Sequence, residues 1–525
     1  MRHPTHGRVA IGRHYLEAHL TEVCVRRGTE SAAMLATPLV ELLAQLRRGE
    51  ISPVELMDAH IRRIEAVNPA INALVAERFA AAQREAVEAE REYGTTARPR
   101  PLLGIPFTVK EMIEVRGMPL TFGSSARRDR RGVRDATVVS RLRAAGAIPV
   151  GVSNVPEWGM WFESYNGLYG RTRNPWNLRH TPGGSSGGEG ALVGAGASVF
   201  GVGSDIGGSV RIPAAFCGVF GHKPTTGMLP LTGHYPVYAT GPDAVLSKKS
   251  PYVTIGTLSR SAADIPPLMR CMAGRDGLDP NSEPVAFLSP ERVEWRGRRV
   301  LLITNPLIDR AGETAPELRE AVEHAGRVLE ARGAYVDHAP NRLFRHAGDI
   351  WFGALQSASG PAFREVLGDG RPVRLPLEVV RTLVGLGRYS WPALFFCLGE
   401  QVGKLNEQGL RRALREFRRL ARLYRALLGD DGVLVTPVHP RTAPRHNAAV
   451  LRPFDFLYTA VFNALRVPAT TAPCGLDASG LPLAVQFASV HGRDHLTIAA
   501  AAALEESIEA WRPALVQDPV PAARD

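Results

Sequence analysis

The sequence predicts an α/β protein whose β-sheet is covered by helices on both faces. The chain has 525 residues, and 45% of them are hydrophobic, which is enough to bury a large core. Segments with helical periodicity alternate with short apolar runs that are typical of buried strands. A third observation is a glycine-rich stretch at 183–209, which indicates where backbone segments approach each other or a ligand closely.

The first half of the chain predicts two helices before its first strand. Ser52, Pro53 and Glu55 suit the N-cap, the first position and the capping-box partner of one helix. A second helix is expected at 80–92, which is rich in Ala, Glu and Arg. The next elements are expected to be a strand at 105–110, a helix that Asp135 caps and that ends at Gly146, and a strand at 147–152.

The second half continues this alternation and then departs from it. Strands are expected at 299–304, 335–336 and 433–437, with a helix whose capping box would be Thr314 and Glu317. Residues 341–425, called here the helical insert, predict helices instead. The bulky aromatic residues of the helical insert are Phe344, Trp351, Phe352, Trp391, Phe395 and Phe396. These rings either fill a helix-packing core or line a binding site, and the residues alone leave both readings open.

The glycine-rich stretch has 11 glycines in the 26 positions from Gly183 to Gly208. Ser185 and Ser186 lie in one glycine-walled turn and Ser209 in another, with an apolar run between them. We therefore expect a buried hairpin-like unit that presents two hydroxyl groups. Glu189 stands where a Walker phosphate loop needs lysine, and the dinucleotide fingerprint lacks its third glycine. These mismatches argue against a nucleotide-binding loop.

A nucleophile elbow is another reading of the same stretch. Gly183, Ser185 and Gly187 match the G-x-S-x-G pattern of that elbow. The elbow must follow a β-strand, whereas residues 177–182 predict a loop. His222 or His234 would be the general base in this reading, although lone histidines are more often structural.

Taken whole, GGSSGGEG followed by GSDIGGSVRIPAAFCGVFGHKPT closely resembles the amidase signature family, which is a group of serine hydrolases with a Ser-Ser-Lys triad. The neighbouring SNVPEWGMWFESYNGLYGRTRNPWN is most similar to the fatty-acid amide hydrolase branch, type 2 in particular. The resemblance covers about residues 36–510. It implies the amidase-signature fold, with a central mixed β-sheet covered by helices on both faces. It also implies an amidase that cleaves carboxylic-acid amides to an acid and an amine or ammonia.

The resemblance also implies the roles of individual residues. Ser209 would be the nucleophile that forms the acyl-enzyme, Ser185 the bridging serine and Lys110 the base. A cis peptide bond is implied before Ser185. The backbone N–H groups of the oxyanion hole would be those of Ile206, Gly207 and Gly208, together with that of Ser209. The expected supporting residues are Ser186, which stabilises its turn, and Asp205 and Arg211, which brace the nucleophile loop through an ion pair.

Lys110 can also be singled out without the family. The chain has 63 basic residues, but only five of them are lysines. Arginine stays protonated in proteins, whereas a desolvated lysine can become neutral and accept a proton. The apolar run 105–109 would carry the Lys110 amine into the interior. The alternative is a strand-end lysine paired with Glu111, which stands where most of the family has aspartate but resembles the type 2 branch.

The substrate is less determined than the chemistry. If the aromatic residues of the helical insert line an acyl channel, amides with apolar acyl or aryl groups are the expected substrates. The alternative is a protein similar to the glutamine-hydrolysing component of an amidotransferase, which has the same triad but needs partner subunits. A catalytically inactive scaffold is disfavoured because all three triad positions are intact. No cofactor and no metal ion are expected, since no ligand cluster appears in the sequence.

Composition bounds the remaining properties. The net charge is +11, but the arginines are scattered without interleaved aromatics, so nucleic-acid binding is not expected. Five widely spaced cysteines predict free thiols in a reducing, cytoplasmic compartment. Neither a transmembrane helix, which needs about 18 or more apolar residues, nor a signal peptide is expected. We expect a loose arm at 1–34, one catalytic domain at 35–515 and a tail at 516–525, and a homodimer is compatible with the chain.

Overall fold

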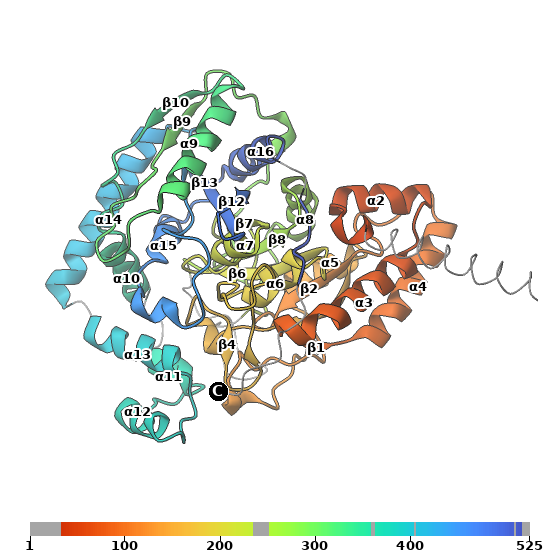
Figure 1. The fold of residues 1–525 in the computed structure, drawn as a ribbon, viewed down its shortest axis with the longest axis horizontal. Helices are drawn as coiled ribbons and strands as arrows, with labels where there is room; N and C mark the ends of the chain where they lie inside the picture. The colour runs from red at the N-terminus through yellow and green to blue at the C-terminus, as the bar shows by residue number, and fades with distance from the viewer. Residues whose placement is uncertain (1–32, 235–250, 359–362, 404–405, 509–510, 517–525) are drawn as a thin grey trace, which may run out of the picture.

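A computed structural model describes residues 33–234, 251–358, 363–403, 406–508 and 511–516 of the chain. Nearly all of the predicted arm at 1–34 and of the tail at 516–525 lies outside these residues, so that division stays a prediction. The described part is built on one large sheet, with helices packed along both sides of it (Figure 1). The predicted α/β class is confirmed.

The large sheet has eleven strands among the described residues, in the order β1-β3-β2-β6-β8-β7-β12-β13-β11-β9-β10. The strands are β1 (Leu74–Glu77), β2 (Pro106–Lys110), β3 (Ile148–Ser153), β6 (Phe200–Asp205), β7 (Phe220–Lys223), β8 (Thr254–Ser259), β9 (Arg299–Leu302), β10 (Tyr335–His338), β11 (Val433–Pro437), β12 (Ala469–Leu476) and β13 (Pro482–Ser489). β2 runs parallel to β3 and β6, and β9 runs parallel to β10 and β11, whereas the other pairs are antiparallel. The sheet is therefore mixed. β4 (Tyr165–Asn166) and β5 (Gly170–Arg171) form a separate pair.

Helices cover both faces of this sheet. The α-helices are α2 (Leu39–Arg48), α3 (Pro53–Ile71), α4 (Phe79–Thr95), α5 (Thr137–Ala144), α6 (Gly187–Gly194), α7 (Arg211–Cys217), α8 (Ile265–Met272), α9 (Pro316–Glu330), α10 (Ala347–Ser357), α11 (Phe363–Leu367), α12 (Leu375–Leu383), α13 (Trp391–Gly403), α14 (Glu407–Leu428), α15 (Leu457–Ala464) and α16 (Asp494–Glu505). Short 3-10 helices are η1 (Ser125–Arg127), η2 (Glu157–Gly159), η3 (Ala262–Asp264), η4 (Pro290–Arg292) and η5 (Ala448–Leu451). α10 to α14 confirm that the insert is helical, and Figure 1 shows α11, α12 and α13 together at one end of the molecule.

Alternation along the strands shows how both faces are buried. Val433 and Val435 of β11 belong to a cluster that includes side chains of α9 and α16. Leu434 between them belongs to a different cluster, with side chains of α10, α14 and α15. Because successive strand residues point to opposite faces, the two clusters lie on opposite sides of the sheet. Because both faces of the strand are buried, its sequence is a continuous apolar run.

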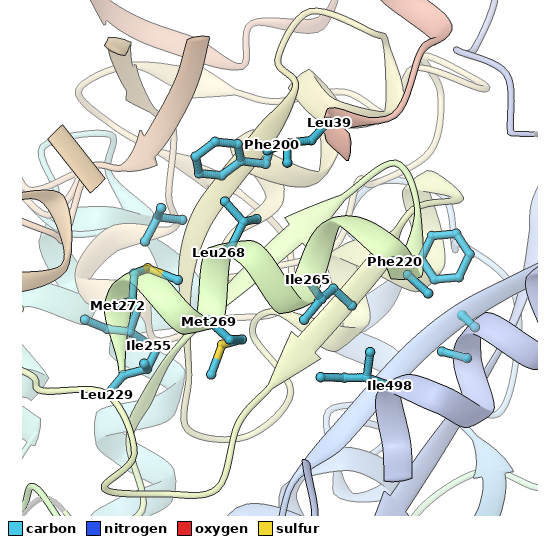
Figure 2. Close-up of a cluster of buried hydrophobic side chains, with 14 of the residues drawn as sticks. Leu39, Phe200, Phe220, Leu229, Ile255, Ile265, Leu268, Met269, Met272 and Ile498 are labelled. Atoms are coloured by element: carbon cyan, nitrogen blue, oxygen red, sulfur yellow. The ribbon is translucent and has the colours of Figure 1, made fainter. Parts of the chain in front are cut away.

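The core beside the parallel strands sets the frame of the site. Phe107 of β2 lies directly opposite Phe200 of β6, and their rings stack with centroids 5.0 Å apart. Figure 2 shows Phe200 in the same buried cluster as Leu268 and Met269, whose helix α8 lies between Phe200 and Ile498 of α16. Apolar burial on this scale contributes the main favourable term in folding. The stacked pair of Phe107 and Phe200 lies within this core, where β2 and β6 are aligned side by side.

The glycine-rich stretch differs from the hairpin-like unit that we expected. Its first turn leads into α6, and β6 follows, so the unit is a turn, a helix and a strand. The glycines allow α6 to pack against backbone: a Cβ on Gly188 would lie 2.6 Å from the Asn154 nitrogen, and one on Gly194 would lie 2.7 Å from the Cys217 oxygen. The prediction mistook glycines required for close helix packing for glycines of a hairpin.

Of the three helix caps predicted from the sequence, one is confirmed and two are wrong. The Ser52 capping box is confirmed, because Ser52 Oγ accepts from the Glu55 N–H and the Glu55 carboxylate accepts from the Ser52 N–H. The Asp135 cap is wrong. α5 begins at Thr137 without a side-chain cap, and Asp135 instead accepts a hydrogen bond from the Arg116 N–H at 2.8 Å.

The Thr314 capping box is also wrong. α9 begins after Ala315 without a side-chain cap, and the Thr314 hydroxyl lies 3.1 Å from the Tyr458 hydroxyl on α15. The capping rule expected the side chains of Thr314 and Asp135 to bond to the start of the following helix. Each instead bonds to a residue farther away in the sequence.

Two further sequence predictions concern thiols and membrane spans. Cys217, Cys271 and Cys474 are free thiols, as predicted, and Cys24 lies outside the described residues. None of the helices formed by the described residues combines the length and the apolar character needed to cross a bilayer.

Candidate active site

The pairing of β2 with β6 brings two parts of the site to one edge of the sheet. The strands are parallel, with Val109 opposite Val202, so their carboxyl ends lie side by side. Lys110 is the last residue of β2, and the turn from Ile206 to Ser209 directly follows β6. The predicted base and the predicted nucleophile therefore come from adjacent strand ends, where α/β folds commonly place ligands.

The turn that carries Ser185 joins this edge from a loop. The Gly184–Ser185 peptide bond is cis, as the family resemblance implied. The Ser186 N–H donates to the Ser209 carbonyl at 3.1 Å, which holds the two serine turns together. Ser186 Oγ also lies 3.3 Å from both the backbone nitrogen and the carbonyl oxygen of Ser204. These bonds agree with the supporting role expected of Ser186.

Lys110 reaches Ser185 inside the protein. Its Nζ lies 2.7 Å from Ser185 Oγ, and the lysine is only 1% exposed. The same Nζ lies 3.0 Å from Ser204 Oγ. The carboxylate of Glu111 turns elsewhere and accepts from the backbone N–H groups of Thr121 and Phe122. The alternative of a strand-end lysine paired with Glu111 is therefore wrong.

The surroundings of Lys110 favour a neutral amine. Burial lowers the pKa of Lys110 from 10.5 to about 7, although the negative charges of Asp205 and Glu189 act in the opposite direction. Burial likewise raises the pKa of Glu189 to about 7, and its Oε2 accepts from the Thr108 hydroxyl at 2.6 Å. No carboxylate lies within ion-pair distance of Nζ among the described residues. Desolvation thus dominates, and it disfavours the charged form of the lysine.

Ser209 lies half-buried at the end of its turn, which offers backbone donors. Among the described residues, the N–H groups of Ile206, Gly207 and Ser209 have no protein acceptor. Gly208 differs from the expectation, since its N–H donates to Asp205 Oδ1 at 2.8 Å. The prediction that the Gly208 N–H is an oxyanion donor is therefore wrong. The physical reason is that the Asp205 carboxylate accepts this N–H and so stabilises the turn.

Asp205 and Arg211 form the ion pair expected of them. Arg211 donates to the two carboxylate oxygens at 2.9 and 3.1 Å, and both side chains are fully buried. Burial alone would raise the pKa of Asp205, but the Arg211 guanidinium and backbone donors hold it well below its usual value. Arg211 also donates to Asn463 Oδ1 at 2.6 Å. The pair thus ties the nucleophile turn to α15.

The nucleophile-elbow reading fails in three dimensions. The residues before Ser185 form a loop and not a strand. His222 is buried between the Thr470 hydroxyl, 2.9 Å from its Nδ1, and Asp494, 3.3 Å from its Nε2. His234 is also buried, and burial lowers its pKa to about 3. Neither histidine hydrogen bonds to Ser185 or Ser209 among the described contacts.

Aromatic residues from the helical insert lie beside both serine turns. The Trp351 indole donates to the Ile206 carbonyl at 2.9 Å, and a Cβ on Gly207 would lie 3.5 Å from the Trp351 ring and 3.3 Å from Phe456. Phe395 packs edge-on against Trp161, with centroids 6.3 Å apart.

The Trp161 contact leads to the other serine turn. The Trp161 carbonyl oxygen would lie 2.9 Å from a Cβ on Gly184, so this backbone adjoins the Ser185 turn. Phe344 differs from these rings, because it packs against Tyr424 and Phe462 in the core. The core-packing reading therefore holds for Phe344, whereas the binding-site reading of the other rings stays a prediction.

Several residues at the site were not singled out from the sequence. Three of them are Ser204, Thr459 and Asn463, whose polar atoms contact Lys110 or the turn that leads to Ser209. Ser204 lies within the motif, but its contact with Lys110 depends on the register of β2 against β6. Thr459 and Asn463 lie more than 240 positions after Ser209. No local signal identifies such partners.

Comparison with known proteins shows the family to which the chain belongs. The family model described as Amidase matches residues 55–498. The chain therefore belongs to the amidase family, the class of hydrolases that cleave amides.

Among individual relatives, the chain is 36% identical over 486 residues to fatty-acid amide hydrolase 2 of Homo sapiens, covering 90% of this chain and 89% of that protein. It is 31% identical over 491 residues to a glutamyl-tRNA(Gln) amidotransferase subunit from Roseiflexus castenholzii, covering 86% of this chain and 92% of the relative. The solved structure of 6-aminohexanoate cyclic dimer hydrolase with substrate aligns with a TM-score of 0.75 at 29% identity, over 92% of this chain and all of that one. The amidase-signature fold is thereby confirmed.

Proposed function

We propose that this amidase cleaves its substrate through an acyl-enzyme on Ser209, with Ser185 as the bridging serine and Lys110 as the base. The observation that carries the proposal is the 2.7 Å contact between Lys110 Nζ and Ser185 Oγ. It lies in a buried site that lowers the pKa of the lysine to about 7. A general base works best when its pKa is near the operating pH.

The reaction begins with the transfer of two protons. Neutral Lys110 accepts the Ser185 hydroxyl proton while Ser185 accepts the proton of Ser209, and Ser209 Oγ bonds to the amide carbon. The carbonyl electron pair moves to its oxygen, where the N–H groups of Ile206, Gly207 and Ser209 stabilise the charge. Nζ keeps its orientation by donating to Ser204 Oγ, which leaves its lone pair for Ser185.

The second half of the reaction uses the same groups in reverse. The proton held by Lys110 returns through Ser185 to the leaving nitrogen, and the C–N bond breaks to release the amine. A water molecule then gives a proton to the same relay and attacks the acyl carbon. The Ser209 ester bond breaks as the relay returns this proton to Ser209 Oγ, and the acid leaves. Lys110 ends in the neutral state in which it started.

We infer that the preferred amides carry apolar acyl or aryl groups. Trp351 and Phe456 lie beside Gly207, and Phe395 packs on Trp161 beside the Ser185 turn. The similarity to fatty-acid amide hydrolase 2 supports the same preference. Burying a substrate CH₂ group against such rings contributes up to about 0.8 kcal/mol, so each early lengthening of the acyl chain should raise kcat/KM several-fold.

A series of acyl anilides of increasing acyl length, assayed beside glutamine, tests this proposal. We expect kcat/KM to rise over the short acyl groups and then to level off, and Ser209→Ala to abolish turnover and labelling by a fluorophosphonate. Phe395→Ala should flatten the slope, whereas Tyr335→Ala, which removes an exposed aromatic on β10, should not. A flat series would contradict the acyl preference, and persistent labelling of Ser209→Ala would contradict the triad.

The alternative function is glutamine hydrolysis within an amidotransferase, and the similarity to the glutamyl-tRNA(Gln) amidotransferase relative supports it. Glutamine as the best substrate, together with copurifying subunits, would favour it. The cytoplasmic location, the homodimer and the lack of nucleic-acid binding stay predictions from the sequence.

A further inference from the structure

Each carbonyl of the turn that leads to Ser209 has a hydrogen-bond donor behind it. The donors are Asn463 Nδ2 to Asp205 O at 3.1 Å, Trp351 Nε1 to Ile206 O at 2.9 Å, Thr459 Oγ1 to Gly207 O at 2.7 Å and the Ile212 N–H to Gly208 O at 2.8 Å. Three of these four donors are side chains from α10 and α15, far from the turn in sequence.

Peptide planarity gives these contacts a consequence for the other side of the turn. A carbonyl and the N–H of the next residue belong to one rigid unit and point in opposite directions when the bond is trans. The donor that holds the Ile206 carbonyl therefore also sets the direction of the Gly207 N–H. This N–H has no protein acceptor among the described residues, and it is one of the proposed oxyanion donors.

Trp351 is the most selective of the side-chain donors. Thr459 Oγ1 also lies 2.7 Å from the Phe456 carbonyl, so its single proton has two acceptors. Asn463 also bonds Asp205 Oδ1 and Arg211. The Trp351 N–H has the Ile206 carbonyl as its acceptor, and the ring, 3% exposed, is held edge-on against Phe456 at 5.1 Å.

We propose that Trp351 is a positioning residue for amide hydrolysis, because its indole N–H holds the Ile206–Gly207 peptide with the Gly207 N–H facing the reacting oxygen. The inference rests on the proposed function, since it assumes a tetrahedral intermediate on Ser209. It also links the helical insert to the chemical step. The element that supplies aromatic rings beside the site orients a donor of the oxyanion hole as well.

The effect of losing this bond should fall on the transition state. Loss of a whole oxyanion donor lowers kcat by about 100- to 1000-fold, and a donor that remains but turns freely should lose less. We therefore expect Trp351→Phe to lower kcat by about 10- to 100-fold and to change KM by no more than about twofold. The affinity for a trifluoromethyl ketone, whose hemiketal oxygen occupies the oxyanion site, should weaken by the same factor as kcat/KM.

The matched control is Trp511→Phe. The Trp511 indole also donates to a backbone carbonyl, that of Gly218 at 2.9 Å, but this carbonyl lies beyond α7 and away from the oxyanion turn. This control should keep kcat within about twofold of the parent protein. Benzothienylalanine at position 351 is a second variant, since it replaces the N–H by sulfur and keeps the ring shape. It should reproduce the loss of kcat even if the smaller phenyl ring disturbs packing.

The outcomes separate this inference from the proposed function. Parental kcat and ketone affinity in the benzothienylalanine protein would overturn the role of Trp351. So would an equal loss of kcat in Trp511→Phe, because the effect would then be structural. Ser209→Ala in the same assays tests the proposed function itself. If that variant turned over substrate, the triad would be wrong, whatever Trp351 does.

Discussion

Lys110 Nζ lies 2.7 Å from Ser185 Oγ at a position where the lysine is 1% exposed. A neutral amine has two N–H groups and one lone pair. In this site one N–H can point to Ser204 Oγ, 3.0 Å away, which leaves the lone pair for the Ser185 proton. The same burial that suits the amine for this task makes its charged form costly.

The activity should fall as the pH falls below about 7. The base must be neutral, and burial lowers the pKa of Lys110 to about 7, so the protonated and inactive form accumulates below that value. The measurement is kcat/KM between pH 5.5 and 9 with an uncharged anilide. Lys110→Arg should be inactive throughout, because a guanidinium keeps its proton. A plateau that extended to pH 5.5 would show that the base is another group.

Lys110→Met should stabilise the fold while abolishing activity. The folded-state pKa of about 7 is below the ordinary 10.5, so the folded state binds fewer protons than the unfolded one between these values. The lysine is therefore most destabilising below pH 7, and this cost declines as the pH rises toward 10.5. We expect the variant to unfold about 2–6 °C above the parent protein at pH 6, with the difference shrinking by pH 9.5. A difference that grew with pH would contradict the assigned charge state.

Ser204→Ala should lower kcat/KM by about 3- to 10-fold, which corresponds to one hydrogen bond of about 0.5–1.5 kcal/mol. The change removes the hydroxyl 3.0 Å from Nζ, so the amine loses an acceptor that orients its lone pair. Ser259→Ala is the control, because Ser259 is also a buried serine, and its hydroxyl donates to the Ser261 carbonyl at 2.8 Å. Equal losses of kcat/KM in the two variants would remove any specific role for Ser204.

Gly208→Ala should reduce kcat by at least about 100-fold, the loss typical of a disturbed oxyanion hole. A Cβ there would lie 2.0 Å from Thr459 Oγ1, and the backbone has φ +121°. Gly475→Ala separates the two causes, since Gly475 has the same φ of +121° with open space around it. The control should lose about 1–2 kcal/mol of stability at most and keep its activity. Full activity in Gly208→Ala would show that the turn is not rigidly held.

Much of the proposed catalytic machinery was accessible from the sequence. Ser185 and Ser209 lie in glycine-rich turns whose order and spacing identify the family, and Lys110 ends an apolar strand in a chain with few lysines. The Ser52 capping box was predicted correctly for a related reason. In these cases the determining interactions lie within a few residues, where backbone geometry and residue type suffice.

Only the tertiary structure decided the remaining features. Ser204 meets Lys110 through the register of two strands, and Trp351 reaches the Ile206 carbonyl from an insert 145 positions away. The Gly208 N–H, expected in the oxyanion hole, was taken by Asp205. The type of a residue determines which hydrogen bonds it can make, whereas the packing of the chain determines which partner lies within reach. The sequence by itself thus determined which groups we propose to react, and the fold decided which groups hold them in position.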